Sequence, residues 1–127
     1  MKGDRKGYTI AILHTPKKKI IRYNETSNSP SSDMTLSLFR VEFRSWHAEM
    51  RIIKFLIDNI YYRNMLASLG IVKMDVFRYT WCGNMANSSK PCDKCRKVIS
   101  LFKEKYMPNT TIEIRYIENN TIKYMYI

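Results

Sequence analysis

Two segments in which apolar residues recur every three to four positions most constrain the fold of this chain. The first predicted helix runs from about Trp46 to Leu66 and ends before Gly70. The second begins at Pro91, whose missing N–H suits a first helical turn, and ends before Pro108. Each helix therefore has one apolar stripe that must face a core. The stripes consist of Trp46, Met50, Ile53, Ile57, Ile60 and Tyr61, and of Cys95, Val98, Ile99, Phe102 and Tyr106.

Five short segments with the alternation or β-branched content of strands surround these helices. The first two predict a hairpin around Pro16, and the last two predict an antiparallel hairpin around a tight polar turn. The order β-β-α-β-α-β-β predicts an α/β domain with one mixed five-stranded sheet and helices packed on it. The five predicted strands are Tyr8–Thr15, Lys19–Asn24, Ile71–Trp81, Thr111–Ile117 and Thr121–Ile127.

The length and composition indicate a single domain over residues 1–127. Of the 127 residues, 45% are hydrophobic, which is enough for one core, and the length leaves no room for a second domain. The polar segments 25–37 and 83–90 are expected to be loops. No apolar run approaches the roughly 20 residues of a membrane-spanning helix, and the N-terminal segment lacks the apolar region of a signal peptide. We therefore expect a cytoplasmic, intracellular protein with no membrane partner.

The chain is basic, with 22 Lys and Arg against 11 Asp and Glu and a formal net charge of +11. Such a charge favours partners that carry phosphate, although many small basic proteins bind no nucleic acid. Two basic clusters, one with Arg44 and one with Lys90 and Lys94, flank the starts of the two helices. We predict that these three residues contact phosphate or nucleic acid, whereas Lys17–Lys19 is equally well a solvated face.

The candidate metal-binding and catalytic residues lie at the starts of the two predicted helices. His47 and Glu49 begin the first helix, and Cys92 and Cys95 begin the second. Cysteines three residues apart share one face of a helix, and a helix N-terminus favours their thiolate forms. Together with His47 they offer zinc three ligands and leave a fourth position open, which is typical of catalytic zinc. Glu49 is then the candidate proton shuttle.

A closed structural zinc site is the alternative interpretation of the same ligands. Cys82 and His14 are the candidate fourth ligands, although Cys82 is more simply a buried or loop thiol. A closed site has no need of a carboxylate two residues after its histidine, so Glu49 favours the catalytic interpretation. All three cysteines lie within one short segment, unlike the spread of a disulfide scaffold.

The combination H-A-E and P-C-x-x-C resembles the signature of the zinc-dependent cytidine and deoxycytidylate deaminase superfamily. The segment CDKCRKVISLF, residues 92–102, is similar to the second signature helix of the free-nucleoside cytidine deaminases, with Lys97 where that family commonly has Gln. The resemblance implies a cytidine deaminase-like three-layer domain, a Zn²⁺ cofactor and a homo-oligomer. It also implies a hydrolase of nucleotide metabolism in which Glu49 moves the protons.

The resemblance also assigns substrate contacts. Asn24 is similar in placement to the asparagine that binds the substrate sugar, and Ala48 corresponds to the residue whose backbone N–H meets the base. Trp81 is expected to supply an aromatic wall if the loop after it folds back. The chain departs from the family in lacking an N-terminal helix and in a longer interval between Glu49 and Pro91.

Three functional hypotheses follow. The first is hydrolytic deamination of a cytosine base, in cytidine or deoxycytidine, free or as a nucleotide, to uracil and ammonia. The second is deamination of cytosine in single-stranded DNA or RNA, which the net charge favours. The third is a catalytically silent structural or binding protein with the same fold. The predicted closing antiparallel hairpin resembles the free-nucleoside branch and favours a small substrate.

Overall fold

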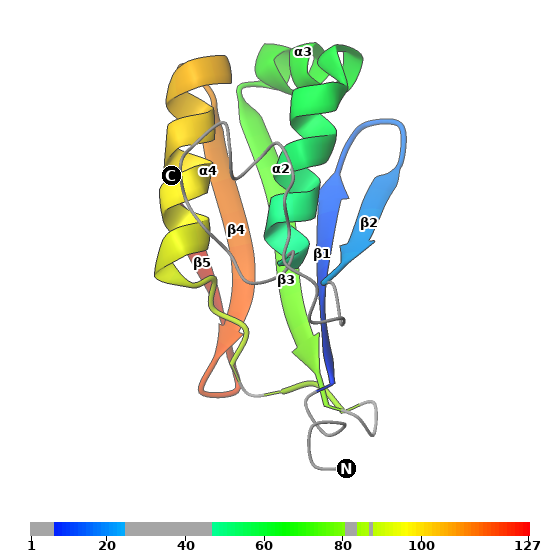
Figure 1. Ribbon diagram of the computed structural model, residues 1–127, viewed down its shortest axis with the longest axis vertical. Helices are drawn as coiled ribbons and strands as arrows, with labels where there is room; N and C mark the ends of the chain where they lie inside the picture. The colour runs from blue at the N-terminus through cyan, green and yellow to red at the C-terminus, as the bar shows by residue number, and fades with distance from the viewer. Residues whose placement is uncertain (1–6, 25–46, 81–83, 87) are drawn as a thin grey trace.

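Five strands form one mixed sheet in the order β2-β1-β3-β4-β5 (Figure 1). The computed structural model describes residues 7–24, 47–80, 84–86 and 88–127. Strands β3 and β4 are parallel and every other neighbouring pair is antiparallel, which confirms the α/β class, the mixed five-stranded sheet and both hairpins. The strands are β1 (Tyr8–His14), β2 (Lys19–Tyr23), β3 (Ile71–Tyr79), β4 (Thr111–Glu118) and β5 (Thr121–Tyr126).

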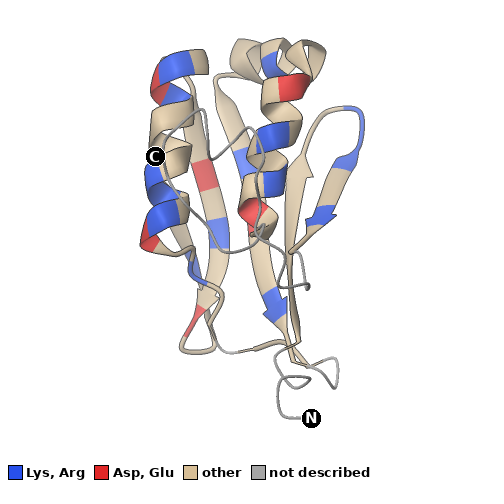
Figure 2. Cartoon of the chain, in the orientation of Figure 1, with Lys and Arg blue, Asp and Glu red and all other residues tan. Residues whose placement is uncertain are grey.

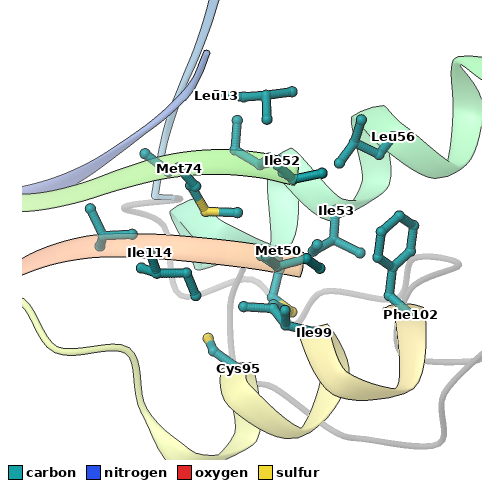
Figure 3. Close-up of a cluster of buried hydrophobic side chains, with 14 of the residues drawn as sticks. Leu13, Met50, Ile52, Ile53, Leu56, Met74, Cys95, Ile99, Phe102 and Ile114 are labelled. Carbon is teal, nitrogen blue, oxygen red and sulfur yellow. The ribbon is translucent and has the colours of Figure 1, made fainter. Parts of the chain in front are cut away.

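Two helices, α2 (Ala48–Asp58) and α4 (Asp93–Tyr106), bury their apolar stripes in one core on one face of the sheet, and α3 (Ile60–Leu69) adds Leu66 to it. The described residues thus form two layers, where the family resemblance implied three. The apolar stripes of α2 and α4 are both buried against this side of the sheet. The predicted core-facing stripe is wrong at Ile60 and Tyr61, which are 60% and 55% exposed. The core includes Leu13, Met50, Ile52, Ile53, Leu56, Met74, Cys95, Ile99, Phe102 and Ile114 (Figure 3).

The prediction of one continuous helix from Trp46 to Leu66 was wrong, because the backbone leaves the helical conformation at Asn59 (φ −122°, ψ 84°). Two side chains bond the carbonyl groups that this break exposes. Asn59 Nδ2 donates to the carbonyl oxygen of Phe55 at 2.8 Å, and Arg63 Nη1 donates to those of Leu56 and Ile57 at 2.9 Å each. The apolar spacing continues across the break, and therefore does not reveal it.

The closing hairpin turns on Asn119 and Asn120, whose φ angles are 54° and 62°. Two successive residues with positive φ are typical of a type I′ turn, which matches the twist of the paired strands. Asparagine tolerates this conformation better than other residues with a side chain beyond Cβ, so the polar pair sets the strand register.

The described helices also bear on charge and on membrane insertion. None of them combines the length and hydropathy needed to cross a membrane. Lys and Arg residues are distributed over the described helices and strands rather than gathered on one element (Figure 2). The net charge of +11 therefore does not by itself mark one binding face.

The face of the sheet opposite the helices contains a buried carboxylate that links three strands. Asp75 on β3 accepts two hydrogen bonds from Arg115 on β4, at 3.1 and 2.8 Å. Its Oδ2 also lies 2.9 Å from His14 Nε2 on β1. The side chain of Asp75 is only 8% exposed, and Arg115 has a raised pKa because of its hydrogen bond to this carboxylate. The network fixes three neighbouring strands in register.

We expect Asp75→Ala to lower the free energy of unfolding by about 1–3 kcal/mol, because hydrogen bonds to a buried charged group are lost. Asp58→Ala is the control, since Asp58 pairs with Lys54 at 2.6 Å on an exposed helix face. Exposed pairs of this kind contribute less than about 0.5 kcal/mol. Urea denaturation of both variants measures the difference. Equal effects of the two substitutions would show that the network is not stabilising.

Candidate metal centre

The N-termini of α2 and α4 lie side by side at the end of the sheet where β3 and β4 finish (Figure 1). His47 immediately precedes α2, and Cys92 is the N-cap residue of α4, with Cys95 in its first turn. Because β3 and β4 are parallel, the chain must run back from the end of β3 to the start of β4, and α4, which makes this connection, therefore has its N-terminus at the end where β3 finishes. Ligand sites commonly occupy this position at the carboxyl ends of parallel strands.

The side chains of His47, Cys92 and Cys95 converge on one point. His47 Nδ1 lies 3.2 Å from Cys95 Sγ and 3.7 Å from Cys92 Sγ, and all three ligand atoms are within 4.8 Å of one another. Tetrahedral zinc with ordinary bond lengths places its nitrogen and sulfur ligands about 3.6 Å apart. The three residues therefore fit a zinc ion in donor type and in spacing, as the sequence predicted.

The two thiols differ in protonation without metal. Cys92 accepts hydrogen bonds from the Cys95 thiol and from His47, and these lower its pKa to about 3. The Cys95 N–H also donates to Cys92 Sγ at 3.4 Å. Donation to Cys92 and burial both raise the pKa of Cys95, and the contact with Cys92 raises that of His47. Metal binding would therefore release the Cys95 proton, since zinc binds the thiolate.

Glu49 is buried in the first turn of α2, with 5% of its surface exposed, and it lines a cavity beside the ligands. Burial raises the pKa of its carboxyl group, against the opposing effects of its own backbone N–H and of His47. A buried carboxyl group with a raised pKa beside a candidate metal site is suited to accept and return a proton.

The cavity has a volume of about 310 Å³ and is open on one side. It is lined by His47 and Cys92 but not by Cys95, so the ligand set faces it through two of its members. Asn24 also lines it, and its position is fixed because Oδ1 accepts from the Thr9 N–H at 2.7 Å. The described residues that line it are Thr9, Asn24, His47, Ala48, Glu49, Arg78, Ser88, Ser89, Lys90 and Cys92.

Most of the predicted site residues that the structure describes line this cavity. Asn24, Ala48 and Lys90 do so, whereas Lys94 is exposed on the first turn of α4 and does not. Trp81, Arg44 and the alternative ligand Cys82 lie outside the described residues. The other alternative ligand, His14, bonds Asp75 instead and is not part of the ligand group.

Sequence reasoning missed four lining residues: Thr9, Arg78, Ser88 and Ser89. The first two are opposite each other in the β1–β3 register, on the face that α2 and α4 cover. Arg78 continues the alternation of the buried residues Met74 and Val76. This alternation is the only feature of the sequence that points to Arg78. It places Arg78 at the site only when the end of β3 is known to lie beside the starts of α2 and α4.

Ser89 holds the metal-binding segment against the sheet. Its Oγ donates to the carbonyl oxygen of Val76 on β3 at 2.7 Å and accepts from the N–H of Ile117 on β4 at 2.8 Å. Its backbone N–H donates to the carbonyl oxygen of Ile117 at 2.8 Å. The regular β3–β4 pairing ends at Asp75 and Arg115, so Ser89 bridges the two strands just beyond it. Cys92 follows three residues later.

Comparison of the chain with protein-family models, with curated proteins and with solved structures finds no match in any of the three. The functional argument therefore depends on the residues of the site.

We expect Ser89→Ala to lower the free energy of unfolding by about 1–3 kcal/mol, because two buried backbone groups lose a partner. It should also weaken zinc binding, measured by competition with a chromogenic chelator. Ser88→Ala is the matched control: Ser88 is exposed, and its bridge to Glu118 is made by the backbone. A similar loss in both variants would contradict the role of the Ser89 hydroxyl group.

In the metal-free protein, we expect the rate at which iodoacetamide alkylates Cys92 to change by less than about twofold between pH 8 and pH 6. A thiol with a pKa of about 3 is a thiolate throughout this range, whereas an ordinary thiol near 8.5 loses more than about tenfold in rate. Mass spectrometry of the labelled peptides measures the rate at each cysteine. Cys95→Ala removes the main hydrogen-bond donor to Cys92, so alkylation of Cys92 in this variant should depend more strongly on pH. If the rate at Cys92 in the wild type falls between pH 8 and pH 6 as that of an ordinary thiol does, Cys92 is not the thiolate assigned here.

Proposed function

We propose that this protein is a zinc-dependent hydrolytic deaminase that acts on a cytosine base. The observation that carries the proposal is the position of Glu49, which is buried, two residues after a ligand histidine, and at the wall of an open cavity. A site that served only to stabilise the fold would need neither this carboxyl group nor a cavity beside its ligands.

The proposed reaction consumes one water and releases ammonia. A C–O bond forms at C4 of the ring, the C4–N bond to the amino group breaks, and the product is uracil. Zinc held by His47, Cys92 and Cys95 would supply activated water at neutral pH. Glu49 would take the two protons of that water in turn and pass one to the ring nitrogen and the other to the departing amine. Its raised pKa suits both directions of transfer.

Two further lining residues support a nucleoside-like substrate. The backbone N–H of Ala48 is in the first turn of α2, where no helical carbonyl group is available to it, so it would donate to the base carbonyl group. Asn24, which directly follows β2, lines the cavity and would contact the sugar hydroxyl groups. A cavity of about 310 Å³ is at the small end of ligand pockets, which favours a single base with its sugar.

The two other hypotheses make different use of the same cavity. Deamination within single-stranded DNA or RNA is supported by the two cations at the cavity, Arg78 and Lys90. A catalytically silent protein is disfavoured by the access that the cavity gives to His47, Cys92 and Glu49. Turnover measurements distinguish all three hypotheses.

The zinc-loaded protein should deaminate cytosine compounds, and Glu49→Gln should lower kcat by about 100-fold or more while zinc stays bound. Cytidine, deoxycytidine, dCMP and a single-stranded oligonucleotide are compared by ammonia release, with zinc measured by elemental mass spectrometry. Glu104→Gln, an exposed carboxyl group on α4, is the control for loss of one charge and should leave kcat unchanged.

Two results would overturn the proposal. Stoichiometric zinc with no turnover of any of the four compounds would favour the catalytically silent alternative. Turnover that survives Glu49→Gln would remove the assigned proton shuttle.

A further inference from the structure

Two basic side chains line the cavity although neither is needed for metal binding or proton transfer. Arg78 is the last helix-facing residue of β3, and Lys90 precedes Pro91 and Cys92. Both are exposed, and a basic segment is visible near the end of β3 (Figure 2). Because both side chains lie at the mouth of the candidate site, we ask which kind of ligand they would contact.

The backbone fixes where Arg78 lies. The residue is paired with Thr9 of β1, and its carbonyl oxygen accepts from the N–H of Ala86 at 2.7 Å, so both sides of the strand end are held. In the part of the chain that the structure describes, no carboxylate pairs with the Arg78 guanidinium group. Its hydrogen-bond donors are therefore available to a ligand.

Lys90 has only a distant partner. Its Nζ lies 4.0 Å from Glu118 Oε2, and the side chain is 41% exposed. Lys123 approaches the other oxygen of Glu118 at 3.9 Å, so the carboxylate keeps a cation nearby when Lys90 turns toward a ligand. An exposed pair at this distance contributes little to stability and is easily given up.

The charges around the cavity do not balance. Among the described residues of the lining, Glu49 is the only one with a carboxyl group, and it is buried, whereas Arg78 and Lys90 are both at the exposed part. A zinc ion with two thiolates and a neutral histidine has no net charge. The lining therefore has an excess of positive charge, which favours an anionic ligand. Cytosine and its sugar are neutral, so the anion must be a phosphate attached to the sugar.

The geometry points to a phosphate-binding site at Arg78 and Lys90, so that the substrate is a cytosine nucleotide rather than a free nucleoside. The inference depends on the proposed function for the identity of the base. A phosphomonoester of a mononucleotide and a phosphodiester of a single-stranded polynucleotide offer the same oxygen acceptors to these donors. The experiment below distinguishes these two sources.

We expect Arg78→Ala to lower the ratio of kcat/KM for CMP to kcat/KM for cytidine by about 10- to 100-fold, the usual effect of losing hydrogen bonds to a charged group. Arg78→Lys should restore part of the ratio, because it keeps the charge without the paired donors. Lys90→Ala should lower the ratio less. Lys73→Ala, which removes an exposed cation on the opposite face of β3, is the control and should leave the ratio unchanged.

Binding without turnover separates this inference from the proposed function. The zinc-loaded Glu49→Gln protein is titrated calorimetrically with CMP, cytidine and a short oligonucleotide containing one cytosine, with Arg78 intact and with Arg78→Ala. If the double variant Glu49→Gln/Arg78→Ala binds CMP or the oligonucleotide more weakly, but the wild type deaminates none of the compounds, the phosphate site is supported and the deaminase activity is rejected. Deamination of cytidine with equal effects of Arg78→Ala on CMP and cytidine would reject the phosphate site alone.

The same titration assigns the source of the phosphate. Tighter binding of CMP than of the oligonucleotide indicates a mononucleotide substrate, and the reverse indicates a single strand. Either order of affinities supports the phosphate site, provided that the tighter binding is weakened by Arg78→Ala. Equal affinity for CMP and cytidine, together with no Arg78-dependent binding of the oligonucleotide, would overturn it.

Discussion

The contact between His47 and the two cysteines is the constraint on which the candidate site depends. It joins the starts of two helices that are 45 residues apart in the chain, with His47 Nδ1 3.2 Å from Cys95 Sγ. Two helix N-termini that meet in this way would place two positive dipole ends close together. The Cys92 thiolate, and then the second thiolate on metal binding, offsets that positive charge, so the arrangement favours a metal with sulfur ligands.

The sheet supports this contact through the one parallel pair of strands. Because β3 and β4 run in the same direction, both end beneath the helix starts, and Ser89 bonds to both strands where their regular pairing stops. Ser89 and its neighbours Ser88 and Lys90 also line the cavity. Asp75 and Arg115 lie at the last regular pair and keep the strands together up to the edge of the site.

Burial and access are divided among the residues of the site in a way that suits the proposed catalysis. Cys95 and Glu49 are both buried, and the pKa of Cys95 is raised by donation to Cys92 and by burial, that of Glu49 by burial. Glu49, Cys92 and His47 line the cavity. Arg78 and Lys90 lie at the exposed part of the lining, where a charged group of a ligand remains partly hydrated. The cavity thus changes from a buried carboxyl group, at Glu49, to exposed cations at its mouth.

The sequence by itself predicted the strands, the hairpins, the cysteine pair and the placement of Glu49 in a first helical turn, because each of these depends on local spacing. The contact of His47 with the cysteines does not, since the fold brings together residues 45 positions apart in the chain. Alternation defines a strand, and cysteines three apart on a helix share a face wherever the helix lies. Local spacing did not reveal the break at Asn59, where side chains replace helical hydrogen bonds. Nor did it place Arg78 and Ser89 at the site or direct His14 to Asp75. These positions were decided by the register of β1, β3 and β4 and by the crossover to α4, which bring together residues that are far apart in the chain.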